Sequence, residues 1–106
     1  MGICVTNVRD DIFNAIITSN KLVVVDFFAT WCGSCRALSP YIDELSINHN
    51  ILFAKANIEE TPVIANELDV KSLPCVIIFE NGREIHRVVG FNKPKLKAII
   101  ENLSES

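Results

Sequence analysis

The chain has 106 residues, of which 49% are apolar and 22% are charged, so it suits one compact domain and is not typical of disordered protein. Its formal net charge is −3 and its lysines and arginines are scattered rather than clustered, which argues against a nucleic-acid partner. We therefore expect residues 1–106 to form a single domain.

No membrane span or secretory signal is visible in the sequence. The longest strongly apolar stretch, residues 22–29, is far shorter than the roughly 20 residues that a membrane-spanning helix needs. The chain does not start with basic residues followed by an apolar run and a small-residue cleavage site. We expect a cytoplasmic protein with no membrane partner, in a reducing compartment where cysteine pairs are more often catalytic or metal-binding than structural.

The first part of the chain alternates strand and helix signals. Residues 3–6 read as a short strand, after which Asp10 or Asp11 can cap a helix whose apolar residues recur at helical spacing. Residues 22–29 are β-branched and aromatic without alternation, which is typical of a strand buried on both faces.

A helix, a strand and a shorter helix are expected next. The first helix should begin at about Cys35 and kink at Pro40, because proline removes one backbone hydrogen bond. Residues 51–57 read as a strand. Thr61 is expected to be the N-cap of a short helix that runs to Leu68, with a proline at its first position.

The last part of the chain predicts a β-hairpin and a final helix. Residues 75–79 and 84–89 read as strands joined by Asn81 and Gly82, the strongest short hairpin signal. Asn92 can cap the final helix. The predicted order βαβαβαββα gives an α/β fold, a three-layer α/β/α sandwich around a mixed five-stranded sheet.

Two cysteines, Cys32 and Cys35, are separated by two residues where a buried strand passes into a helix. At the helix N-terminus the unpaired N–H groups and the helix dipole favour negative charge, so Cys32 should form the reactive thiolate readily. Cys35 lies one turn further in and should be less exposed. The spacing predicts that Cys32 attacks a substrate disulfide and that Cys35 then resolves the mixed disulfide.

Metal binding and a purely structural disulfide are the alternatives for this pair. A closed zinc site needs four ligands, and the other candidates, Cys4, Cys75, His49 and His86, form no second pair with zinc spacing. A disulfide that closes so short a loop removes little entropy from the unfolded chain. We expect no metal, and no cofactor either, because no glycine-rich nucleotide-binding turn is present.

The cysteine motif and its surroundings resemble the thioredoxin family over most of the chain. The matching segments lie at residues 25–36, at Pro40, and at residues 70–74, 79–82 and 89–90. The resemblance implies the thioredoxin fold and a protein dithiol–disulfide oxidoreductase that reduces disulfides of other proteins, with a part in electron transport and cell redox homeostasis. It further implies a monomer that thioredoxin reductase, a flavin enzyme using NADPH, returns to the dithiol state.

Asp26 and Lys55 are the next site candidates. Asp26 stands among apolar strand residues, so burial should raise the pKa of its carboxyl, although it could also be a structural polar residue with satisfied hydrogen bonds. The resemblance implies a buried acid that moves protons to and from Cys35, a role that a raised pKa suits. It also implies that Lys55 pairs with Asp26, although a lysine can instead extend to solvent.

The resemblance implies a substrate-binding surface around the cysteines. Its apolar rim would comprise Trp31, Gly33, Leu73, Pro74, Val89, Gly90 and Phe91. The peptide bond before Pro74 is expected to be cis, and the backbone of Leu73 to pair with an extended substrate segment, as in strand addition. Gly90 would allow close approach of a partner backbone.

The chain departs from the family pattern at three positions, and one of them, Arg36, keeps positive charge near Cys32 where lysine is common. Ser34 stands where proline is commonest, and its N–H and hydroxyl should stabilise the Cys32 thiolate, giving a less reducing protein than a proline-containing relative. Cys75 replaces a threonine after Pro74 and is expected to be an inert core residue rather than a third redox thiol, as is Cys4.

Two other functions stay open on the sequence alone. The apolar rim could dock a fixed partner with redox state only switching affinity, but a buried acid and two cysteines argue against a pure scaffold. Ser34 could also point to an oxidase or isomerase of an oxidising compartment, a reading that the missing secretory signal and Asp26 weigh against.

Overall fold

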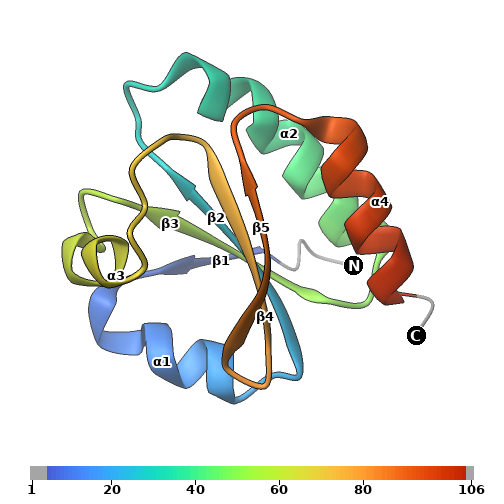
Figure 1. The fold of residues 1–106 in the computed structure, drawn as a ribbon, viewed down its shortest axis with the longest axis horizontal. Helices are drawn as coiled ribbons and strands as arrows, with labels where there is room; N and C mark the ends of the chain where they lie inside the picture. The colour runs from blue at the N-terminus through green and yellow to red at the C-terminus, as the bar shows by residue number, and fades with distance from the viewer. Residues whose placement is uncertain (1–4, 105–106) are drawn as a thin grey trace.

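The computed structural model of the chain describes residues 5–104, in which strands and helices follow one another in the predicted order (Figure 1). The strands are β1 (Val5–Val8), β2 (Leu22–Phe28), β3 (Leu52–Asn57), β4 (Cys75–Glu80) and β5 (Arg83–Val89). The helices are α1 (Asp10–Thr18), α2 (Gly33–Asn48), α3 (Pro62–Glu67) and α4 (Lys93–Ser104). The predicted α/β class, with a mixed five-stranded sheet between helical layers, is confirmed.

The strands form one sheet in the spatial order β1-β3-β2-β4-β5. β1, β3 and β2 run parallel, whereas β4 is antiparallel to β2 and β5 is antiparallel to β4. β2 is therefore central, and its Asp26 lies beside Lys55 of β3 and beside Val76 of β4. The loop that leaves the carboxyl end of β2 carries the chain through Cys32 into α2, at the sheet edge where α/β proteins commonly place their sites.

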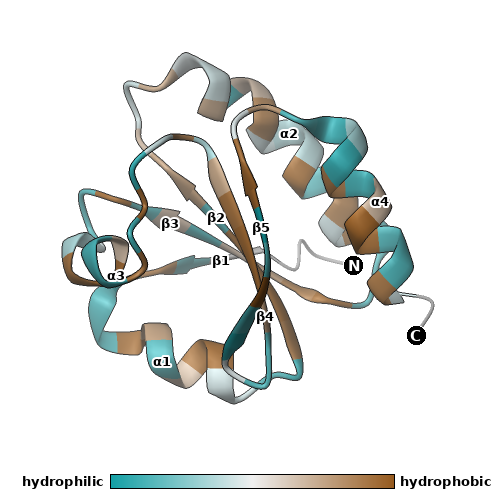
Figure 2. Ribbon diagram, viewed as in Figure 1, coloured by the Kyte–Doolittle hydropathy of each residue, from teal (hydrophilic) through white to brown (hydrophobic). Residues whose placement is uncertain are grey.

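Helices cover both faces of the sheet, and the central strands are largely apolar (Figures 1 and 2). α1 and α3 pack on one face through Phe13, Ile17 and Ile64. α2 and α4 pack on the other through Leu38, Ile42, Leu45, Leu96 and Ile100. Alternate residues of β2 enter the two clusters, so this strand is buried on both faces as predicted. Each large side chain buried in this way stabilises the fold by about 1.5–3 kcal/mol.

Several element boundaries differ from the prediction by one residue, and those of β1 and α2 differ by two. β1 continues to Val8, two residues beyond the end of the strand predicted at residues 3–6, and residues 3 and 4 of that prediction lie outside the described part of the chain. α2 begins at Gly33 rather than near Cys35. The reason is that Cys32 is extended and its sulfur accepts the Cys35 N–H, which is the geometry of an N-cap.

The cap of α3 comes from a different helix. Thr61 occupies the N-cap position as predicted, but its hydroxyl donates to the Asn57 carbonyl instead of accepting from the helix. The Asp10 carboxylate accepts the N–H groups of Val63 and Ile64 at 3.2 and 3.0 Å. Asp10 lies inside the first turn of α1 rather than at its N-cap, so it ties α1 to α3 instead of capping its own helix.

The hairpin and the last helix form as predicted. Asn81 and Gly82 have φ values of 52° and 82°, which fit the two-residue turn that favours an Asn-Gly pair. The Asn92 side chain accepts the Lys95 N–H at 3.1 Å and caps α4. Pro40 lies inside α2, as expected.

Candidate active site

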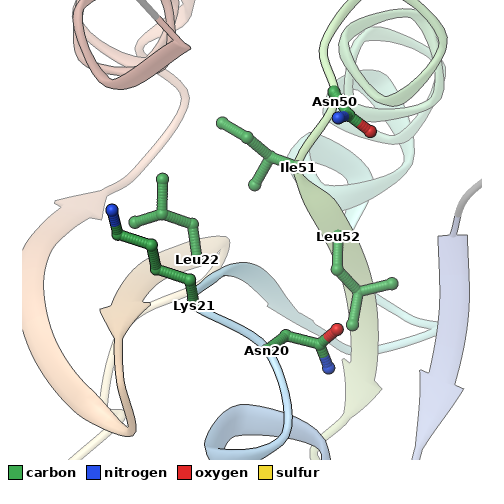
Figure 3. A pocket seen from close by; sticks show the side chains of 6 residues that line it. All are labelled: Asn20, Lys21, Leu22, Asn50, Ile51 and Leu52. Atoms are coloured by element: carbon green, nitrogen blue, oxygen red, sulfur yellow. The ribbon is translucent and has the colours of Figure 1, made fainter. Parts of the chain in front are cut away.

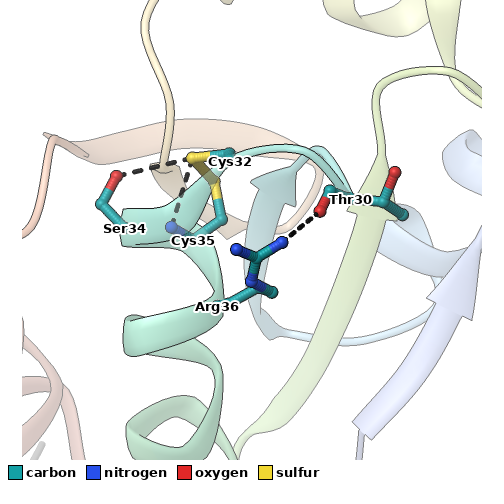
Figure 4. The surroundings of a disulfide bond; sticks show 5 residues. All are labelled: Thr30, Cys32, Ser34, Cys35 and Arg36. Carbon is teal, nitrogen blue, oxygen red and sulfur yellow. Dashed lines mark hydrogen bonds between the residues drawn. A yellow bond between two sulfur atoms is a disulfide. The ribbon is translucent and has the colours of Figure 1, made fainter.

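Cys32 and Cys35 are joined by a disulfide where the chain enters α2 (Figure 4). Their Cα atoms are 5.3 Å apart, within the range of ordinary disulfides. Cys32 caps the helix and keeps 8% of its surface exposed, whereas Cys35 is 2% exposed. Cys32 is therefore the sulfur that solvent reaches more readily.

Two donor groups face the Cys32 sulfur. The Cys35 N–H donates to it at 3.2 Å, and the Ser34 hydroxyl lies 3.4 Å away (Figure 4). The first turn of α2 adds the positive end of a helix dipole. Groups of this kind stabilise negative charge on sulfur, which a nucleophilic thiolate requires.

The loop between β2 and α2 is held by its own hydrogen bonds. The Arg36 guanidinium donates to the Thr30 carbonyl at 2.9 Å (Figure 4), and the Cys32 N–H donates to the Ala29 carbonyl at 3.2 Å. These bonds fix the entry to the helix and so the place of Cys32. Trp31, within the same loop, is 66% exposed.

Asp26 is buried in the middle of β2. It is 1% exposed, and its Oδ1 atom has no hydrogen-bond partner among the described residues. Loss of water raises the pKa of its carboxyl from 3.8 to about 7; the Lys55 charge opposes this rise and the Asp43 charge adds to it. A cavity of about 200 Å³ is bordered by Asp26, Cys35, Ser39 and Lys55 among others, so the carboxyl and the inner cysteine face one space.

Lys55 does not form the predicted ion pair with Asp26. Its ammonium lies 2.9 Å from an Asp43 carboxylate oxygen and donates to the Ser39 hydroxyl, and both partners are on α2. Asp43 is partly exposed, so a charge pair with it costs less desolvation than one with the buried Asp26. Lys55 acts on its strand neighbour Asp26 only as a nearby positive charge, which favours the ionised carboxyl.

Part of the predicted rim lies against the disulfide. Leu73 packs on the small cluster that contains Cys32 and Cys35. The Leu73–Pro74 peptide bond is cis, as predicted. Pro74 itself is buried, and its carbonyl accepts the Gly90 N–H at 2.8 Å, which fixes the end of β5 beside it.

The exposed part of the rim is apolar. Val89 is 54% and Phe91 47% exposed, on either side of Gly90, and Trp31 precedes Cys32. Gly90 has a φ of +89°, a conformation that disfavours any other residue. Three large exposed apolar side chains this close to the cysteine loop and to Leu73 form a surface suited to a protein partner.

Cys75 is separate from the cysteine pair in its packing. It is 1% exposed and belongs to the cluster under α1 and α3, not to the cluster of Cys32 and Cys35. Burial raises the pKa of its thiol, which lowers thiolate content and reactivity. These observations agree with an inert core residue; Cys4 lies outside the described residues.

A second cavity, of about 400 Å³, lies at the opposite end of β2 (Figure 3). It is lined by Asn20, Lys21, Leu22, Asn50, Ile51 and Leu52. Lysine is its only ionisable side chain, so it offers no acid, base or nucleophile pair. Within residues 5–104, no group of three or more His, Cys, Asp or Glu side chains is placed to hold a metal ion. No helix in that range is long and apolar enough to cross a membrane.

Known proteins are similar to the chain in sequence and in structure. The family model described as Thioredoxin matches residues 4–102. Thioredoxin-2 of Pyricularia oryzae is 45% identical over 96 residues, covering 90% of this chain and 55% of that protein. The thioredoxin of Echinococcus granulosus is 39% identical over 98 residues, covering 92% of each chain. The solved structure of Plasmodium falciparum thioredoxin matches with a TM-score of 0.88 and 32% identity, covering 92% of this chain and 97% of that one.

Proposed function

The chain belongs to the thioredoxin family and is a thiol–disulfide oxidoreductase, and on that premise we propose that it reduces disulfides of other proteins through Cys32 and Cys35. One observation carries the proposal: the more exposed cysteine caps α2 and is bridged to a buried partner one turn into the helix. Such a pair of thiols can give two electrons to a substrate disulfide and close to the disulfide between Cys32 and Cys35.

The reaction proceeds in two exchanges of a thiolate with a disulfide. In the dithiol form the Cys32 thiolate attacks one substrate sulfur, breaks the substrate disulfide and releases the first substrate thiolate. The Cys35 thiolate then attacks the Cys32 sulfur of the mixed disulfide and expels the second substrate thiolate. The substrate gains two electrons and two protons, and the chain is left with the disulfide seen in the structure.

Asp26 supplies the base for the second exchange. Cys35 is buried and must lose its proton before it can attack, and the Asp26 carboxyl borders the same cavity. With a pKa of about 7, the carboxyl is partly ionised at neutral pH and can accept that proton. Lys55 tunes this group through its charge, and its ion pair with Asp43 holds the ammonium in place.

Substrate binding takes place on the rim. The exposed side chains of Trp31, Val89 and Phe91 provide apolar contact area, while Gly33 and Ser34 leave the approach to Cys32 open. The backbone of Leu73 bonds an extended substrate segment. The contact of Leu73 with the cysteine cluster supports this placement, because it puts the segment next to the reacting sulfurs.

We also propose a cellular setting for the chain. The chain works as a monomer and a single domain over residues 1–106, in the cytoplasm, without a resident metal or cofactor. Thioredoxin reductase returns its disulfide to the dithiol. The family membership and the position of the disulfide support this cycle, since each turnover leaves an oxidised pair that needs an external reductant.

Reduction of a disulfide-bonded protein, followed with dithiothreitol as the terminal reductant, tests the proposal. Wild type should accelerate the reaction, Cys32→Ser should abolish the acceleration, and Cys35→Ser should stop after forming a mixed disulfide. A chain in which both cysteines are serine separates an enzyme from a docking scaffold. If that double variant retains full biological activity, the proposed function is wrong.

A further inference from the structure

Arg87 of β5 joins its strand to the residues that follow α3. Its guanidinium donates to the Leu68 carbonyl at 2.8 Å and to the Asp69 carbonyl at 3.5 Å. The same group forms a fork with Glu84, at 2.7 and 2.8 Å. The bond to the Leu68 carbonyl is partly buried, whereas the bonds to Asp69 and Glu84 are exposed to water. One side chain thus joins the edge strand to the end of α3.

The end of α3 is a tight reversal closed by backbone hydrogen bonds, and Leu68 and Val70 pack against the core on that face of the sheet. The Val70 N–H bonds back to the Ala65 carbonyl, and Asp69 adopts a φ of +58°, which is unfavourable for a residue other than glycine. The helix end leaves the Leu68 carbonyl directed away from the helix, and Arg87 is its donor. The guanidinium therefore stabilises this reversal at the carbonyls that flank the strained residue.

The segment after the reversal is the one that reaches the disulfide. Residues 70–74 run from α3 to β4 and include Leu73, which packs on the cysteine cluster. β5 contacts the chain on both sides of this segment, because Arg87 bonds the Leu68 and Asp69 carbonyls just before it and the Gly90 N–H bonds the Pro74 carbonyl at its end. Loss of the Arg87 contact would weaken the hold on the chain before the segment, while the Val70 bond to the Ala65 carbonyl and the bond at Pro74 remain.

We propose that Arg87 is a positioning residue for substrate: held by Glu84, it fixes the turn at Leu68 and Asp69 and so presents Leu73 in the orientation that a polypeptide substrate needs. The inference rests on the proposed function. It assigns Arg87 to the binding of extended substrates and not to the sulfur chemistry, because the guanidinium bonds Glu84 and the carbonyls of Leu68 and Asp69 rather than the cysteine pair.

The test compares two substrates in Arg87→Met, which keeps an apolar stem of similar length but removes the charged fork. If only about a tenth of the Arg87→Met molecules hold the segment in place at any time, KM for a disulfide-bonded protein should rise about tenfold over wild type. The kcat value and the rate with a small aromatic disulfide should stay within about twofold of wild type. Arg87→Lys should fall between, because one ammonium cannot serve two carbonyls and Glu84 together. Hydrogen exchange at the amides of residues 70–73 should be slowest in wild type, faster in Arg87→Lys and fastest in Arg87→Met.

Ile100→Val is the matched control, because it loosens the cluster on the opposite face of the sheet. It should lower the melting temperature without changing KM. If Arg87→Met lowers the melting temperature but leaves KM and exchange at wild-type values, the proposal is overturned. If Arg87→Met does not fold, Glu84→Gln is used instead, because it keeps the guanidinium but removes the carboxylate that holds it. Unchanged KM and unchanged hydrogen exchange in Glu84→Gln also overturn the proposal. If the wild-type protein reduces neither substrate, the proposed function is refuted instead. Hydrogen exchange at residues 70–73 then still tests whether Arg87 holds the segment.

Discussion

Replacing Asp26 with asparagine should change how the stability of the protein depends on pH, so that the variant gains on wild type as pH rises. The native carboxyl keeps its proton up to a pKa of about 7, whereas in the unfolded chain the proton leaves near 3.8. Between these values the native state binds more protons than the unfolded state, so the free energy of unfolding of wild type falls as pH rises. Asparagine does not titrate and removes this fall.

The magnitude follows from the separation of the two pKa values. About three pKa units correspond to about 4 kcal/mol of unfolding free energy between about pH 4 and about pH 8. The asparagine amide brings a cost of its own for a buried unpaired group, of about 1–3 kcal/mol, but that cost is the same at every pH. The difference between Asp26→Asn and wild type should therefore grow by about 4 kcal/mol over this range, in favour of the variant.

Urea denaturation of both disulfide-bonded proteins, repeated from about pH 4 to about pH 8, measures this difference. Asp11→Asn is the matched control, because the Asp11 side chain is 68% exposed and the same chemical change there should give parallel curves. If the Asp26→Asn and wild-type stabilities also run parallel, the buried carboxyl titrates normally. Its proposed role as a base for Cys35 then loses its support.

Three further substitutions test other parts of the site and fold. Ser34→Pro removes the hydroxyl that lies 3.4 Å from the Cys32 sulfur and should lower the reduction potential by about 30 mV; an equal or higher potential in redox titration with glutathione contradicts this. Asp10→Ala removes the cap of α3 and should cost about 1–2 kcal/mol in denaturant unfolding; a loss no larger than typical surface substitutions rules out the cap. Lys55→Met removes the charge that favours the ionised Asp26 and should raise the Asp26 pKa further, as followed by carboxyl NMR; an unchanged or lower value refutes that coupling.

The features that depend on neighbouring residues could be predicted from the sequence. The run of apolar residues around Asp26 indicates a strand buried on both faces, and burial alone accounts for the direction of its pKa shift. The spacing of Cys32 and Cys35 at a strand-to-helix passage gives the disulfide, because both residues lie within one helical turn. The positive φ values at the Asn-Gly hairpin likewise follow from two adjacent residues.

The features that join distant parts of the chain could not be predicted in this way. Asp10 caps a helix more than fifty residues away. Lys55 turns to Asp43 instead of its strand neighbour, a choice that depends on how closely α2 crosses the sheet. Arg87 reaches the end of α3 only because β5 lies at the sheet edge beside that loop. The four-residue spacing of Ser39 and Asp43 on α2 is a signal that could have suggested partners for a lysine.

The most direct test of the central claim is to trap the covalent intermediate. Reduced Cys35→Ser, mixed with a disulfide-bonded protein, should accumulate a mixed disulfide, because Cys32 can attack but no second thiol can resolve the product. Peptide mass spectrometry should find the linkage at Cys32. Absence of an adduct, or an adduct formed through Cys75 with Cys32 left free, would contradict the account.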